Sequence, residues 1–139
     1  MTFGEMKELI RSYLPNRYDN LQISDATLRL MVHRALKRIA KETVPLKLVV
    51  NDITGLTVIR KVDDQTYIRY PIIPYGDDSD IDIDEELVEA VAAHVCSELE
   101  PQRKGHYLQQ YEREIRQNND RLIETDLDEC TNGGKESWL

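Results

Sequence analysis

The sequence predicts a mainly α-helical domain with a small antiparallel β insertion, an α+β fold with about four helices and a β-hairpin region. Apolar residues recur at helical spacing near both ends of the chain, and the period changes from 3.6 to 2 in the middle. Pro15, Pro45 and Pro101 separate these segments. At 139 residues the chain can bury one core, so we expect a single domain over residues 1–127 and a flexible, polar tail over residues 128–139.

Two helices are predicted before the β insertion. Thr2 and Glu5 have the spacing of a capping box, in which each side chain accepts a hydrogen bond from the backbone N–H of the other residue. The first helix ends at the first proline. A second helix begins after Ser24, a good N-cap, and ends near Thr43, because Pro45 disfavours helical geometry in the residue before it. The apolar stripes of the two helices are formed by Met6, Leu9, Ile10, Tyr13 and Leu14, and by Leu28, Met31, Val32, Ala35 and Ile39.

The second predicted helix also bears a cluster of positive charge in an acidic chain. Four basic residues share one helix face through their i+3 and i+4 spacing: Arg34, Lys37, Arg38 and Lys41. Such a face is solvated, or contacts an acidic protein surface, or contacts a phosphate backbone. The spacing alone leaves all three readings open.

The β insertion is predicted at about residues 46–73, where Val, Ile, Thr and Tyr are frequent. Asp63 and Asp64 interrupt two of these runs, and we expect both to be exposed at the tip of a hairpin. Pro71 and Pro74 lack the backbone N–H that a ladder needs, so the sheet should end there.

Residues 77–86 hold seven carboxylates in ten positions. Four acids fall at positions 1, 3, 5 and 12 of an EF-hand loop: Asp78, Asp80, Asp82 and Glu89. However, Ile83 stands where that loop needs glycine, so we predict no calcium site. Acid–base catalysis needs carboxylates in different environments, which adjacent acids on one loop do not have.

We therefore expect these acids to start a helix. In this interpretation Asp82 or Asp84 caps the helix. Glu85 and Glu86 lie in its first turn, where the helix dipole favours negative charge. The remaining acids would form a solvated loop: Asp77, Asp78 and Asp80.

Two more helices are predicted after this segment. The third begins at Glu85 and ends at Pro101, with an apolar stripe formed by Leu87, Val88, Val91, Ala92, Val95 and Leu99. The fourth begins around Arg103, and its narrow stripe is typical of a helix that projects or contacts a neighbour. That stripe is formed by Leu108, Tyr111, Ile115 and Leu122, and the polar flank by Glu112, Arg113, Arg116 and Asn119.

Charge and motifs restrict the function classes. The formal net charge of −8 disfavours a dedicated nucleic-acid binder. No two of the three histidines have the i, i+4 spacing of a helical zinc site, and no nucleophile elbow, phosphate loop or dinucleotide fingerprint is present. We expect no enzyme activity, cofactor or metal. No apolar run is long enough to span a bilayer and no signal peptide is recognisable, so synthesis inside the cell and no membrane association are expected.

The order of these elements resembles the head-to-tail adaptor proteins of tailed bacteriophages, also called connector or head-completion proteins. The similarity spans roughly residues 1–125. It depends on the turn Ser24-Asp25-Ala26-Thr27-Leu28 that opens the second helix, and on the late helix that follows an acidic loop at Asp84-Glu85-Glu86-Leu87.

This resemblance implies a structural virion protein in the neck between head and tail, made in the host bacterial cytoplasm. Such adaptors form a ring, commonly of twelve copies, beneath the portal protein, extend the DNA channel and hold a tail or stopper protein. Double-stranded DNA would pass without sequence-specific binding. Exposed ion pairs contribute only about 0–1 kcal/mol each, so isolated subunits can be monomers. The candidate contacts with a neighbouring subunit or the portal are Arg34, Lys37, Arg38, Lys41, Asp77, Asp78, Asp80, Glu112, Arg113, Arg116 and Trp138.

Two other classes compete with this interpretation. A small DNA-binding regulator would place the basic face of the second helix on phosphate, but the loop before that helix has about nine residues, against the 3–4 of a helix-turn-helix. A metal-binding or enzymatic domain is favoured only by the spacing of the acids between residues 78 and 89.

Overall fold

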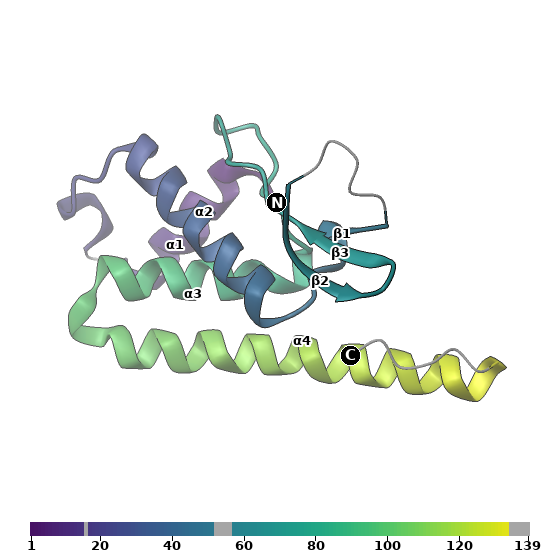
Figure 1. Ribbon diagram of the computed structural model, residues 1–139. Helices are drawn as coiled ribbons and strands as arrows, with labels where there is room; N and C mark the ends of the chain where they lie inside the picture. The colour runs from purple at the N-terminus through teal and green to yellow at the C-terminus, as the bar shows by residue number, and fades with distance from the viewer. Residues whose placement is uncertain (16, 52–56, 134–139) are drawn as a thin grey trace.

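The computed structural model describes residues 1–15, 17–51 and 57–133, with side chains described as far as residue 123. Four helices and a small antiparallel sheet confirm the predicted α+β class (Figure 1). The helices are α1 (Phe3–Tyr13), α2 (Asp25–Glu42), α3 (Val88–Leu99) and α4 (Lys104–Gly133). The strands are β1 (Val49–Val50), β2 (Val58–Asp63) and β3 (Thr66–Arg69). Short 3₁₀ helices lie at η1 (Tyr18–Asn20), η2 (Leu46–Leu48), η3 (Glu85–Leu87) and η4 (Pro101–Arg103).

Helix α3 is the centre of the core. Ten of its twelve residues are buried, because α1 and α2 pack on one side of it and α4 runs back along the other (Figure 1). The small side chains of Ala90, Ala92 and Ala93 are fully buried, which lets the neighbouring helices approach closely.

The predicted starts of the first two helices are confirmed, whereas the third helix, expected to begin at Glu85, begins at Val88 after η3. The Thr2 hydroxyl accepts from the Glu5 N–H at 3.2 Å, and Glu5 accepts from the Thr2 N–H at 3.0 Å, which completes the capping box. The Ser24 hydroxyl accepts from the Thr27 N–H at 3.1 Å. Helix α2 ends at the C-cap Thr43, as the following proline predicts.

The sheet has the strand order β1-β3-β2, and its hairpin is the predicted one. Asp64 is exposed at the turn, but Asp63 is half-buried as the last residue of β2, and its carboxylate accepts from the Gln65 N–H at 2.9 Å. Strand β3 ends at Arg69, before the two prolines. The first expected strand is shorter than predicted, because residues 46–48 form η2 instead.

Helix α4 is longer than predicted. Its buried stripe contains Tyr107, Tyr111, Ile115 and Leu122. The helix runs to Gly133, past the expected end of the domain at residue 127, and its last turns continue beyond the rest of the described fold (Figure 1). Trp138 lies outside the described residues.

Candidate functional site

The acidic segment, residues 77–86, does not start a helix in the way the sequence predicts. Asp84 precedes η3, but its carboxylate accepts from the backbone N–H groups of Leu46 at 2.7 Å and Lys47 at 2.6 Å. The carboxylate therefore satisfies the first turn of a different element, η2. The Asp84 carboxylate thus binds the first N–H groups of the 3₁₀ turn that residues 46–48 form in place of the expected strand.

Asp82 also fails to cap the helix, because it is paired elsewhere. Its side chain is 7% exposed and accepts from two guanidinium nitrogens of Arg69 at 2.5 and 2.9 Å. The backbone N–H of Ile72 adds a third hydrogen bond at 2.8 Å. Burial alone would raise the pKa of Asp82, but the hydrogen bonds from Arg69 and Ile72 outweigh burial and hold the pKa below its usual value. Asp82 thus fixes the chain that leaves β3.

The backbone of the acidic segment pairs with the N-terminus of the protein. The Phe3 N–H donates to the Ser79 carbonyl at 2.9 Å, and the Gly4 N–H donates to the Asp77 carbonyl at 3.0 Å. A Cβ on Gly4 would lie 3.3 Å from that Asp77 oxygen, so the close approach favours glycine. The amino group of Met1 also pairs with Glu85.

These contacts bear on the calcium interpretation. Asp82 is paired with Arg69, and Glu89 accepts a hydrogen bond from the Tyr13 hydroxyl. Within residues 1–15, 17–51 and 57–123, no group of three or more His, Cys, Asp or Glu side chains is arranged to hold a metal ion. Asp82 and Glu89 therefore contribute to the fold through separate partners.

Only part of the acidic segment remains as a surface. Asp77 forms an ion pair with Lys7 at 2.8 Å, and Lys7 also reaches Asp25 at the start of α2. Asp78 and Asp80 are exposed and form no ion pair within the described part of the chain. We call these two residues the acidic rim.

An apolar loop, residues 70–75, lies next to the acidic rim in the sequence and shares a groove with it. Pro71 and Pro74 are buried, whereas Ile72, Ile73 and Tyr75 are 64%, 45% and 83% exposed. A groove of about 180 Å³ is lined by this loop together with Lys47, Asp80 and Asp82. The loop is not among the residues predicted to form a contact, although its signal is in the sequence: two prolines flank two isoleucines.

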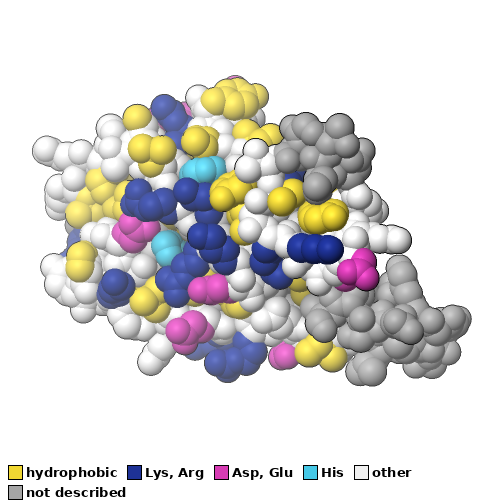
Figure 2. All heavy atoms as spheres, in the orientation of Figure 1, with side chains coloured by type: hydrophobic (Ala, Val, Ile, Leu, Met, Phe, Trp, Pro, Cys, Tyr) yellow, Lys and Arg dark blue, Asp and Glu magenta, His cyan; other side chains and the backbone are white. Residues whose placement is uncertain are grey.

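The second surface is the outward face of α2. The face buried against the core contains Leu28, Val32, Leu36 and Ile39. Opposite to it, at i, i+4, i+7 and i+11 spacing, lies a row that we call the basic stripe: Leu30, Arg34, Lys37 and Lys41. Figure 2 shows Lys and Arg side chains gathered over α2 in the middle of this face of the molecule.

The four basic residues predicted to share this face have different environments. Arg34 pairs with Glu98 of α3 at 2.5 Å. Arg38 donates to Glu42 at 2.8 Å and lies 4.8 Å from the centre of the Tyr111 ring, so it packs towards α4. The two lysines of the stripe make no ion pair within the residues that the structure describes. The charge available to a partner is therefore concentrated on Lys37 and Lys41.

The polar flank of α4 is only partly a surface. Glu112, Arg113 and Arg116 are exposed, as predicted for a contact surface. Asn119 is half-buried and accepts from the Thr43 hydroxyl at 2.5 Å. The adjacent Asn118 is buried and donates to the same hydroxyl at 2.9 Å, so this part of the flank ties α4 to the end of α2.

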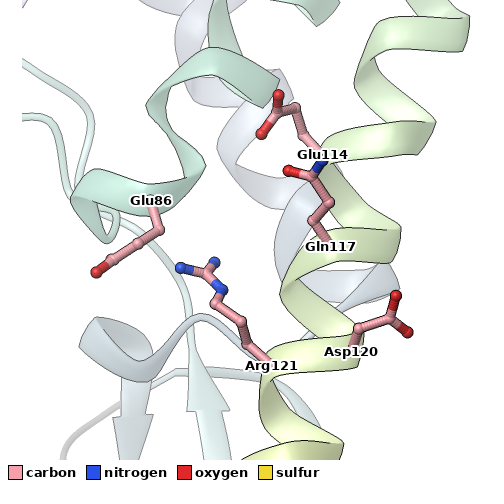
Figure 3. A pocket seen from close by; sticks show the side chains of 5 residues that line it. All are labelled: Glu86, Glu114, Gln117, Asp120 and Arg121. Atoms are coloured by element: carbon pink, nitrogen blue, oxygen red, sulfur yellow. The ribbon is translucent and has the colours of Figure 1, made fainter.

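A second hollow lies between η3 and α4, with a volume of about 500 Å³ (Figure 3). It is lined by Glu86, Glu114, Gln117, Asp120 and Arg121. Burial, and then the nearby charge of Glu89, raises the pKa of the Glu114 carboxyl. Arg121 points from α4 towards η3 and donates to Asn118 at 2.6 Å. The lining combines three carboxylates, one amide and the guanidinium of Arg121.

No protein-family model, curated protein or solved structure matches this chain. Among the described residues, no helix combines the length and the apolar character needed to cross a membrane.

Proposed function

We propose that this protein is a structural subunit of a bacteriophage virion, a head-to-tail adaptor that forms a ring on the portal protein. The observed α+β fold, with its β insertion between α2 and α3, agrees with what the resemblance implies. The ring would extend the DNA channel and hold a tail or stopper protein in the neck of the virion.

The observation that carries this proposal is the presence of two exposed surfaces of unlike chemistry. The basic stripe lies on α2, and the apolar loop with its acidic rim follows β3. A subunit of a closed ring contacts one neighbour through one surface and the other neighbour through a different surface. Two complementary surfaces are therefore what such a subunit requires.

The charge of the chain also suits a DNA channel. A formal net charge of −8 repels the phosphate backbone at long range, so DNA could pass without sticking to the ring. Arg113 and Arg116 on the outward side of α4 offer a separate, positively charged contact for the portal or for the next tail component.

Electron microscopy of the purified protein with the portal protein of the same virus tests the proposal. We expect ring-shaped densities on the portal, with a DNA-sized central channel, and no such rings when the portal is omitted at low concentration. A portal that stays bare at high adaptor concentration would contradict the proposed function.

The basic stripe also favours a second candidate, a small DNA-binding regulator, because Lys37 and Lys41 are available to phosphate. A gel shift with double-stranded DNA at increasing salt separates the two functions. A regulator would bind DNA and lose affinity steeply with salt, whereas an adaptor would show no shift at physiological salt.

A further inference from the structure

We propose that the basic stripe of one copy docks on the apolar loop of a second copy, with Lys37 and Lys41 facing Asp78 and Asp80 of the acidic rim. This inference rests on the proposed function, since it names the contact between adjacent subunits of the ring. The occupant of the apolar loop is therefore another copy of this chain.

Both surfaces contain exposed apolar groups. Ile72, Ile73 and Tyr75 project from the loop, and Leu30, which is 52% exposed, lies at one end of the basic stripe. Burying them together removes apolar surface from water, at roughly 25 cal/mol per Å² before the costs of association. This apolar burial adds to the free energy of association, to which exposed ion pairs alone would contribute little.

The apolar loop is already held in one shape before any partner arrives. Its two prolines are buried, and the Ile72 N–H is bound by Asp82, which Arg69 holds in place. A loop ordered in advance loses little conformational entropy on binding. The isoleucines are thus presented outward by a rigid support.

Charge identifies the second copy as the partner. Two copies with a net charge of −8 repel each other in most orientations. The basic stripe is a positive surface on this chain, and the acidic rim lies directly beside the apolar loop. The docking of stripe on loop brings opposite charges together and hydrophobic groups together in the same contact.

The two surfaces can be used at once. The basic stripe and the apolar loop share no residue. The stripe lies on the side of α2 opposite to its buried face. The acidic segment is instead linked to the N-terminal end of α2, because Lys7 pairs with both Asp77 and Asp25. A contact between unlike surfaces leaves one stripe and one loop open on every pair, so it can repeat around a ring.

The contact should be weak in solution. It involves few residues, and its ion pairs are exposed, so we expect an interface below the roughly 1,600 Å² of a standard stable complex. The expected dissociation constant lies in the micromolar to millimolar range. On the portal, neighbouring subunits are held at high effective concentration, and the same contact then closes the ring.

Two variants of the full chain break the two surfaces separately. The stripe variant combines Lys37→Glu with Lys41→Glu, and the rim variant combines Asp78→Lys with Asp80→Lys. The matched control, Lys61→Glu with Lys104→Glu, has the same net charge as the stripe variant but changes exposed lysines elsewhere. Lys37 is half-buried and the other five side chains are exposed. Substitutions of exposed side chains usually alter the stability by less than about 0.5 kcal/mol.

The measurement is a concentration series of amide NMR spectra, supported by sedimentation velocity. In the wild type and the control, signals of the basic stripe and of the apolar loop should shift together with concentration. Each surface variant should self-associate at least about tenfold more weakly. In a mixture, the stripe variant keeps a functional loop and the rim variant keeps a functional stripe. Isotope labelling of one partner at a time should therefore show shifts in the loop of the first and in the stripe of the second. The reversed charges of the two variants also attract each other, so the two altered surfaces should shift as well.

Several results would overturn the contact. These are spectra that do not change up to the solubility limit, shifts located elsewhere, a control as weak as the stripe variant, or no recovery in the mixture. If double-stranded DNA shifts the stripe signals while dilution does not, nucleic acid is the occupant and the proposal is wrong.

The same variants separate this inference from the proposed function. If the wild type forms rings on the portal and both surface variants do so equally well, the function stands and the contact is wrong. If stripe and loop associate in solution but no portal is ever decorated, the contact stands and the adaptor role is wrong.

Discussion

Asp82→Asn tests whether the acidic segment is held by the pairing that the structure shows. The change keeps the shape of the side chain but removes the negative charge of the carboxylate. That carboxylate accepts hydrogen bonds from two guanidinium nitrogens of Arg69 and from the N–H of Ile72. Asparagine has one acceptor oxygen, and its NH₂ group would face a guanidinium donor, so at least one charged hydrogen bond is lost.

The cost can be estimated from this geometry. A hydrogen bond to a charged group contributes about 1.5–3 kcal/mol, and removing one partner of a buried ion pair costs about 3–5 kcal/mol. The side chain of Arg69 is 20% exposed and can recover some hydration, so the lower end applies. We expect Asp82→Asn to lower the free energy of unfolding by about 3 kcal/mol.

Urea denaturation followed by circular dichroism measures this loss. With an m value of about 2 kcal/mol/M, the midpoint should fall by about 1.5 M. Asp80→Asn is the matched control, because Asp80 is exposed and forms no ion pair within the described part of the chain, and it should change the stability by less than about 0.5 kcal/mol. Equal effects of the two substitutions would refute the role assigned to Asp82.

The dependence on pH gives an independent check. The folded-state pKa of Asp82 is lowered, so its contribution to stability is present above the unfolded-state pKa of about 3.9 and is lost as the pH falls through the folded-state pKa. The stability difference between the wild type and Asp82→Asn should therefore be full at neutral pH and shrink below about pH 4. A difference that stays constant to lower pH would mean that the carboxylate charge is not the cause.

Three further predictions follow from single contacts. Thr2→Ala removes the acceptor for the Glu5 N–H and should cost about 1 kcal/mol, measured as a lower melting temperature; Lys104→Ala, an exposed change in another helix, is the control. Asn118→Ala breaks the buried link between α4 and Thr43 and should lower the urea stability by about 2 kcal/mol, whereas the exposed Gln117→Ala should not. Burial raises the pKa of the Cys96 thiol to about 12, so little reactive thiolate is present at pH 8. In a Cys130→Ser background, its reaction with a thiol reagent at pH 8 should be about a thousandfold slower than that of a free thiol. Unfolding the chain in urea should remove this difference.

The features that the sequence predicts correctly are local ones. The Thr2–Glu5 capping box, the Ser24 cap and the stop at Thr43 all involve groups within a few residues of one another. Their hydrogen bonds depend on backbone geometry that neighbouring residues determine. The alternation between helix and strand was likewise readable from the period of apolar residues.

The acidic segment could not be interpreted correctly from its sequence, because the groups that bind its carboxylates are distant in the chain. Asp84 meets the N–H groups of Leu46 and Lys47, and Asp82 meets Arg69. A carboxylate one or two residues before a helix is a frequent cap, and the local pattern contains nothing that opposes this choice. The donors to these two carboxylates are determined by where β3 and η2 lie in the folded protein.

The apolar loop shows how the same contacts bear on function. A loop that only connects β3 to η3 would gain free energy by turning its isoleucines inward, since burial of such a side chain contributes about 1.5–3 kcal/mol. Here the prolines are inside instead, and the ion pair of Asp82 with Arg69 holds the Ile72 backbone so that the isoleucines face water. A partner that covers these side chains would remove this apolar surface from water, as the proposed contact requires. It follows that Asp82→Asn should weaken self-association as well as stability, and that Ile72→Ser with Ile73→Ser should weaken self-association while leaving the fold intact. If the isoleucine variant loses self-association but keeps its stability, and Asp82→Asn loses both, then the acidic segment supports self-association by holding the apolar loop in place.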